Sequence, residues 1–194
     1  MSAAREEPPI LEVSGRAELR AWLDANAATS AGVRLAIGKK GNTATTLTYD
    51  DAVEEALNFG WIDSVAGRLD DARYTVHFTP RKPRGGWART NKIRVERLIA
   101  DGQMTPAGLA AIDAAKADGS WTLLDDVEDL IVPDDLAAAL AGNPAAGRFW
   151  DGLGESPRKI ALYRIASAKR PETRARRIAE TVAEAAEGRA RNSP

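Results

Sequence analysis

The strand-like segments of this chain are confined to residues 33–78, and this limits the folds that it can adopt. Apolar residues alternate with other residues at Val33, Leu35 and Ile37, and again at 74–78. Such alternation is typical of strands that bury one face. A third strand is predicted at 61–65, paired antiparallel with 74–78 through the connecting residues 67–71. The three segments together predict a small, mainly antiparallel sheet.

Helix-forming sequence surrounds these strands. A first helix is predicted from Ser14 to about residue 28, and a second begins at Thr48, where Asp51 completes a capping box in place of Glu. Later helices begin with a proline in the first turn, at Thr105-Pro106, Asn143-Pro144, Ser156-Pro157 and Pro171. The sequence therefore predicts an α+β fold, with a small antiparallel sheet packed with helices and followed by a C-terminal all-helical segment.

An acidic segment divides the chain. Residues 119–135 contain six carboxylates and no basic residue, which is typical of a loop-like boundary. We therefore expect a disordered N-terminus at 1–14, an α+β domain at 15–130, a helical segment at 131–188 and a tail at 189–194.

Composition excludes several kinds of site. The chain of 194 residues has no cysteine and one histidine, so disulfides, thiolate catalysis and cysteine- or histidine-rich metal centres are excluded. It contains neither an EF-hand nor a phosphate-binding loop motif. We expect no cofactor and no bound metal.

The sequence also limits the expected cellular location and the expected binding partners. The N-terminus lacks the apolar core of a signal peptide, and no apolar run approaches the ~20 residues needed to cross a bilayer. We expect a cytoplasmic protein without membrane contact. Net charge is −1, and no zinc-finger or RNA-binding motif is present, so nucleic acid is not an expected partner. A protein partner or a second copy of the chain stays an alternative.

The segment 58–91 contains the candidate site. Its glycines and prolines fix unusual backbone paths, and its acid and cations lie beside tryptophans. We predict a pocket for a small anionic ligand. The anion would be held by the cations Lys39, Lys40, Arg81 and Lys82. The ligand would stack on Trp61 and Trp87, and Asp63 would orient the cations. Asn91, which we expect primarily as a helix cap, would add a ligand contact.

Catalysis is the alternative for the same residues. Asp63 beside an apolar ring can act as a general acid or base, with Arg81 and Lys82 stabilising an oxyanion. Asp63 can equally form an ion pair that only holds the loop. A serine triad is not expected, because Ser64, like the other serines, lacks an evident histidine partner and His77 points away from the apolar strand face.

Two blocks of the chain are strongly basic. Residues 79–97 carry seven cations and one acid, and residues 158–177 carry eight cations and one acid. Arginine forks suit bidentate contacts with anions. The alternatives are ion pairs with the acidic segment, solvated helix faces, or a basic last helix that docks a protein or a nucleic acid.

Several motifs in the chain are specific. They are Leu47-Thr-Tyr49, Phe59-Gly-Trp-Ile-Asp-Ser64, Phe78-Thr-Pro-Arg-Lys-Pro83, Gly102-x-Met104-Thr-Pro-x-Gly108 and Ala168-Lys-Arg-Pro-Glu-Thr-Arg174. These motifs resemble those of the YdeI/OmpD-associated (OmdA) proteins, also called bacteriocin-protection proteins, and the similarity extends over roughly residues 15–188.

The resemblance implies a compact α+β domain followed by a helical one, and a role linked to porins and to bacteriocin tolerance. It implies no particular reaction. The chain has Asn58 where relatives often have cysteine, and Ala88 where they often have serine. A nucleophile at either position in relatives would be missing here, which favours binding over catalysis.

Overall fold

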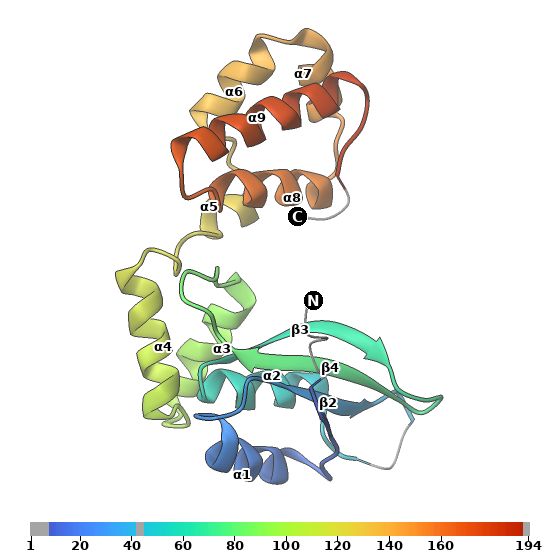
Figure 1. Ribbon diagram of the computed structural model, residues 1–194, viewed down its shortest axis with the longest axis vertical. Helices are drawn as coiled ribbons and strands as arrows, with labels where there is room; N and C mark the ends of the chain where they lie inside the picture. The colour runs from blue at the N-terminus through green and yellow to red at the C-terminus, as the bar shows by residue number, and fades with distance from the viewer. Residues whose placement is uncertain (1–7, 42–44, 192–194) are drawn as a thin grey trace, which may run out of the picture. The chain divides into compact units, whose positions relative to one another are not determined.

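The computed structural model describes residues 8–41 and 45–191, which form two compact units (Figure 1). The first unit comprises the described residues up to 85 together with 90–118. The second comprises 86–89 and the described residues from 119 onward. The chain therefore enters the second unit briefly before it completes the first.

The first unit contains a mixed four-stranded sheet in the order β1-β2-β4-β3. Its strands are β1 (Ile10–Leu11), β2 (Val33–Gly38), β3 (Trp61–Arg68) and β4 (Arg73–Pro80). β1 and β2 are parallel, whereas β4 is antiparallel to both β2 and β3. The predicted α+β class, with a small sheet and a helical C-terminal segment, is confirmed.

The register decides which side chains face the core. Leu35 pairs with Val76, and Phe78 pairs with both Val33 and Asp63, so these residues share one face of the sheet. All four of the apolar side chains are buried. Asp63 is thus the one acid of this set, placed on the face that the helices cover.

Two helices lie side by side next to the sheet (Figure 1). They are α1 (Arg16–Asn26), which buries Leu19 and Leu23, and α2 (Tyr49–Asn58), which buries Val53 and Leu57. The predicted capping box at the start of α2 is present, because Thr48 accepts from the Asp51 N–H and Asp51 accepts from the Thr48 N–H. This cap determines where α2 begins and therefore where its first residue, Tyr49, lies.

Two further helices belong to this part of the chain, α3 (Arg89–Ala100) and α4 (Pro106–Ala117). α4 approaches the turn between α2 and β3 closely, since a Cβ at Gly108 would lie 2.3 Å from the carbonyl oxygen of Asn58. At the same turn Gly60 has a φ of 74°, a conformation that favours glycine. This turn leads the chain from α2 directly into β3.

The second unit is helical. It contains α5 (Asp125–Glu128), α6 (Asp134–Ala141), α7 (Pro144–Asp151), α8 (Glu155–Ala166) and α9 (Pro171–Ala186). Leu136, Trp150, Leu162 and Ile165 are among the residues of its buried core. Trp87 packs on Trp121 within this unit, with ring centroids 5.0 Å apart.

Three local predictions need correction or restriction. Ile10 and Leu11 form a strand in the segment expected to be disordered, because pairing with β2 satisfies their backbone, while residues 1–7 lie outside the described part. α8 begins at Glu155, after the N-cap residue Gly154, rather than at the predicted cap Ser156. Residues 42–44, and residues 192–194 of the predicted tail, also lie outside the described residues.

Candidate functional site

A hydrogen bond between a phenol and a carboxylate stands at the centre of the candidate site. The Tyr49 hydroxyl, from the first turn of α2, donates to Oδ2 of Asp63 at 2.6 Å. Asp63 directly precedes an irregularity in the pairing of β3 with β4, between positions 63 and 66. Such bulges commonly re-aim side chains next to functional sites.

Arg81 supplies the first cation. Its backbone N–H donates to the carbonyl of Gly60 at 3.0 Å, which ties the end of β4 to the α2–β3 turn. Burial lowers the pKa of Arg81 to about 10, and the negative charge of Asp63 acts in the opposite direction. Arg81 therefore keeps its charge at neutral pH within electrostatic reach of Asp63.

Arg94 supplies the second cation, from α3. Its guanidinium donates to Oδ1 of Asp50 at 2.6 Å and to Oδ1 of Asn91 at 3.1 Å. α3 begins at Arg89, so Asn91 lies in the first turn and is not the cap that the sequence predicts. Its side chain is buried and orients Arg94.

We call Tyr49, Asp63, Arg81, Asn91 and Arg94 the Asp63 cluster. Burial, and then the hydrogen bond to Asp63 and its charge, raise the pKa of Tyr49 to about 12, while Arg94 acts in the opposite direction. Tyr49 is thus a neutral hydrogen-bond donor at physiological pH. The cluster joins the Tyr49 phenol to the Asp63 carboxylate and places two guanidinium groups nearby, one of which, Arg94, is already paired with Asp50. Guanidinium groups of this kind suit the binding of an anion better than proton transfer.

The raised pKa of Tyr49 predicts a specific alkaline titration. In an absorbance titration of the tyrosines, we expect a component near pH 12 that disappears in Tyr49→Phe. The folded pKa lies above the ordinary value of 10.0, so the stabilisation from Tyr49 is complete below pH 10 and is lost as the pH rises towards 12. The stability difference between wild type and Tyr49→Phe should narrow over that interval. A component near pH 12 that survives in Tyr49→Phe would contradict the assignment.

The predicted tryptophans are packed inside the protein. Trp61 is 1% exposed, donates its indole N–H to the carbonyl of Ala27 at 3.3 Å, and meets the Trp22 ring edge-on. Trp87 is also 1% exposed and belongs to the second unit. Both rings are buried and pack on other tryptophans, so this packing does not support their predicted stacking on a ligand.

The predicted lysines lie in two places. Lys82 is exposed and adjacent to Arg81. Lys39 donates to the carbonyls of Asp70 and Asp71, at 2.9 and 3.2 Å, beside the turn between β3 and β4. Because Gly38 pairs with Arg73 at the start of β4, this end of the strand is roughly 23 Å from Pro80. The structure does not bring Lys39 and Lys40 to the Asp63 cluster.

Tyr49 and Arg94 were missed by sequence reasoning. Each carries a local signal: Tyr49 directly follows a capped helix start, and Arg94 lies three residues after Asn91, on the same helix face. Neither signal shows that the two helices meet at Asp63. That meeting depends on contacts between residues distant in the chain.

Ser64 does have a histidine neighbour, contrary to the prediction. Its Oγ lies 3.5 Å from Nδ1 of His77 across β3 and β4. The hydroxyl, however, donates to the His77 carbonyl at 3.2 Å. The imidazole contact is at the limit of a hydrogen bond, so the arrangement does not activate the serine.

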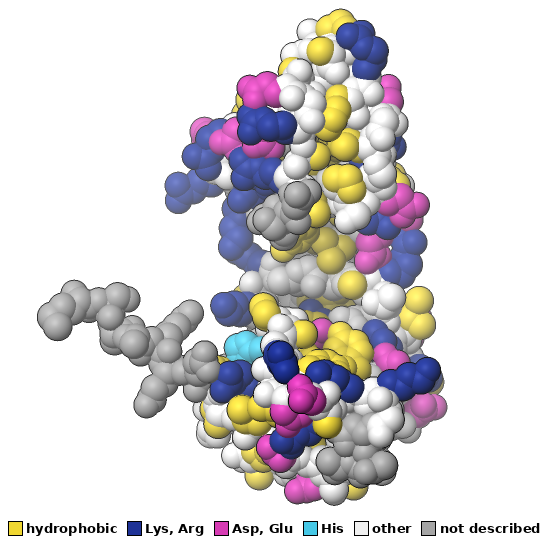
Figure 2. All heavy atoms as spheres, turned by 90° about the vertical axis from the view of Figure 1, so that its right-hand side faces the viewer, with side chains coloured by type: hydrophobic (Ala, Val, Ile, Leu, Met, Phe, Trp, Pro, Cys, Tyr) yellow, Lys and Arg dark blue, Asp and Glu magenta, His cyan; other side chains and the backbone are white. Residues whose placement is uncertain are grey.

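The basic blocks are largely paired with acids. Arg89 contacts Glu128 and Asp129 of the acidic segment, and Arg174 forms a bidentate pair with Asp135 at 2.6 and 2.8 Å. Figure 2 shows the same mixture, with Lys and Arg side chains next to Asp and Glu side chains on the visible face. Ion pairing therefore accounts for much of both blocks.

The described residues provide neither a metal site nor a membrane-spanning helix. Among residues 8–41 and 45–191, no group of three or more His, Asp or Glu side chains could hold a metal ion. In that same part of the chain, no helix is long and apolar enough to cross a membrane.

Two family models match the chain. Residues 11–111 match the model described as Domain of unknown function (DUF8412), and residues 129–188 match the model described as Bacteriocin-protection, YdeI or OmpD-Associated. The first range includes the whole Asp63 cluster, and the second includes α6 to α9. The predicted family resemblance is confirmed for the second range. No curated protein and no solved structure matches the chain.

Proposed function

Since this chain belongs to the DUF8412 family through residues 11–111 and ends in a YdeI/OmpD-associated domain at 129–188, we propose that it is a cytosolic binding protein that takes a small anionic ligand at the Asp63 cluster. The ligand carries a carboxylate or phosphate group. Arg81 contacts this group, with Lys82 at its rim. Arg94, which is paired with Asp50 and oriented by Asn91, adds positive charge nearby, and Tyr49 holds the Asp63 carboxylate in position.

The main support for this proposal is the burial of the Arg81 guanidinium near Asp63. Burial makes the charged form of this guanidinium costly, and the charge of Asp63 only partly offsets that cost. A bound anion would add to this offset, and the planar guanidinium can bind it in a bidentate manner.

Binding is better supported than catalysis at these residues. Asp63 already accepts a hydrogen bond from Tyr49, and a tyrosine with a pKa of about 12 holds its proton at neutral pH. An enzyme that used Asp63 as general base would have to use the other oxygen, Oδ1, or break that hydrogen bond. Tyr49 itself cannot serve as the base, because it stays protonated.

We also propose a role in stress or antimicrobial tolerance, which is supported by the second family description because it names bacteriocin protection. We propose that occupancy of the Asp63 cluster reports the level of an anionic metabolite, to which such a response is adjusted. This role rests on ligand binding, so it is tested only after a ligand has been found.

The direct test is a thermal-shift screen against phosphorylated and carboxylated metabolites, using wild type and an Arg81→Ala/Lys82→Ala double variant. A true ligand at 100 times its dissociation constant stabilises the wild type by about 2.7 kcal/mol. The double variant should show little of this stabilisation.

A matched control is available in the same sheet. The Lys39→Ala/Lys40→Ala variant also loses two cations, but at the opposite end of β4. It should respond to the ligand as the wild type does. A ligand that stabilises the Arg81/Lys82 double variant equally well, or a screen with no hit, would overturn the proposal and favour a macromolecular contact instead.

A further inference from the structure

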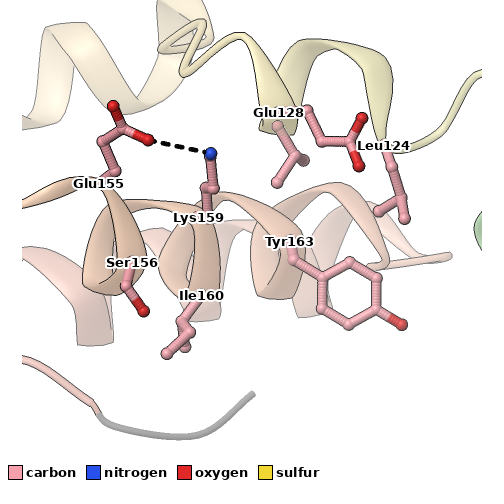
Figure 3. Close-up of a pocket in the computed structure, with 8 residues that line it drawn as sticks. Leu124, Glu128, Glu155, Ser156, Lys159, Ile160 and Tyr163 are labelled. Carbon is pink, nitrogen blue, oxygen red and sulfur yellow. Dashed lines mark hydrogen bonds and ion pairs between the residues drawn. The ribbon is translucent and has the colours of Figure 1, made fainter. Parts of the chain in front are cut away.

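The second unit contains an open pocket of about 560 Å³ between the short helix α5 and helix α8 (Figure 3). Its volume is in the range of small-molecule sites. It is formed entirely by residues of this unit and shares none with the Asp63 cluster. The pocket is therefore a separate site.

The walls of the pocket are apolar. Leu124 and Val127 line it from the side of α5, and Ile160 and Tyr163 line it from α8. Lys159, Ile160 and Tyr163 are spaced so that one face of α8 presents all three. Figure 3 shows the Tyr163 ring at the opposite end from Lys159 and Glu155, and at the same end as Leu124 and Glu128.

The charged groups at the rim already have partners. Lys159 Nζ lies 3.1 Å from Oε2 of Glu155, one turn earlier on α8 (Figure 3). Both carboxylate oxygens of Glu128 accept from the backbone N–H of Arg89, each at 3.1 Å. A charged ligand would therefore enter an apolar pocket and lose its hydration without gaining an available counter-charge. The charge pattern selects an uncharged ligand.

The wall formed by α5 is thin. A smaller cavity of about 160 Å³ lies beside Val127, Ile131 and Leu162, so Val127 separates two hollows. α5 spans only four residues and is followed by Leu130 with a φ of 58°, a strained value for leucine. Val127 also belongs to the buried core of this unit, and this packing fixes its side chain between the two cavities.

From these observations we propose that the α5–α8 pocket binds an uncharged, mainly apolar small molecule with at least one aromatic ring. The ring packs on Tyr163 between Leu124 and Ile160, because offset aromatic pairs add to the gain from apolar burial. The site is in the helical domain, whereas the anionic ligand binds in the α+β domain. The chain thus carries two ligand sites of opposite chemistry.

A pair of fluorescent probes with one skeleton tests this proposal. N-phenyl-1-naphthylamine is uncharged, and 1-anilinonaphthalene-8-sulfonate adds a sulfonate to the same rings. We expect saturable binding of the uncharged probe to the full chain, at least about tenfold tighter than that of the sulfonate. Equal affinities, or no saturable binding of the uncharged probe, would overturn the proposal.

Variants then locate the site. Ile160→Glu should weaken binding of the uncharged probe at least about tenfold, because it places a carboxylate on the apolar wall. Ile160→Phe keeps the wall apolar and fills part of the pocket, so it should also weaken binding even if Ile160→Glu does not fold. Ile93→Glu, at an isoleucine that is 60% exposed in α3, should bind as the wild type does. Unchanged binding in both Ile160 variants would disprove the location.

Discussion

Replacing Glu55 with alanine is expected to lower the free energy of unfolding by about 3 kcal/mol, the lower end of the range for breaking a buried ion pair. Glu55 is only 1% exposed. Its carboxylate accepts from Arg16 Nε at 2.6 Å and from Arg20 Nη1 at 3.1 Å, which joins α2 to α1. Both arginines also contact Gln103, so the same network holds the turn before α4. The two arginine side chains are about a third exposed, which limits the penalty.

Urea unfolding of wild type, Glu55→Ala and Glu55→Gln measures this effect. Glu55→Gln should fall between the other two, since the amide keeps a hydrogen-bonding oxygen but loses the charge. Glu96→Ala is the matched control, because Glu96 lies exposed on α3 and surface substitutions usually change stability by less than ~0.5 kcal/mol. Equal losses in Glu55→Ala and Glu96→Ala would show that the network adds nothing to stability.

Gly108→Ala is expected to destabilise the first unit by at least about 3 kcal/mol, at the upper end of overpacking costs. The added Cβ would lie 2.3 Å from the carbonyl oxygen of Asn58. That oxygen cannot move easily, because it accepts from both the N–H and the hydroxyl of Thr105, at 3.1 and 2.6 Å. Helix propensity acts in the opposite direction and favours alanine by only ~1 kcal/mol.

Thermal and urea unfolding of Gly108→Ala can be compared with those of Gly147→Ala. Gly147 is also inside a helix, but its added Cβ would meet its nearest neighbour, the Leu140 oxygen, at 3.4 Å. Gly147→Ala should therefore be neutral or stabilising by up to ~1 kcal/mol. A Gly108→Ala protein as stable as wild type would mean that α4 can move away from the α2–β3 turn at little cost.

Local signals in the sequence predicted much of the first unit. The Thr48–Asp51 cap gives the start of α2, and the alternation at 33–37 and 74–78 gives the strands and their buried face. These features depend on residues within a few positions of one another. β1 escaped prediction because two residues are too few to show an alternation.

The candidate site was predicted only in part, for the same reason. Asp63 and Arg81 were identified as neighbours of an unusual loop, and the structure places them within electrostatic reach. Tyr49 reaches Asp63 because α2 packs beside β3, and no pattern within either segment encodes that contact. Trp87 was assigned to the same pocket as Trp61, yet its partner Trp121 lies 34 positions further along the chain. No residue near Trp87 in the sequence indicates that its ring packs on Trp121 and not beside Trp61.

Residues 86–89 belong to the second unit although they precede the end of the first in the sequence, and this limits where the chain can be divided into domains. The matched range 11–111 includes these residues, although they pack with the helical unit. A fragment that starts at Gly119 lacks the tryptophan that covers Trp121 and the arginine that pairs with Glu128 and Asp129. A junction placed between residues 89 and 119 would therefore remove contacts that the helical unit makes with its own upstream residues. A transfer of the helical unit to another chain keeps these contacts only if residues 86–89 are transferred with it.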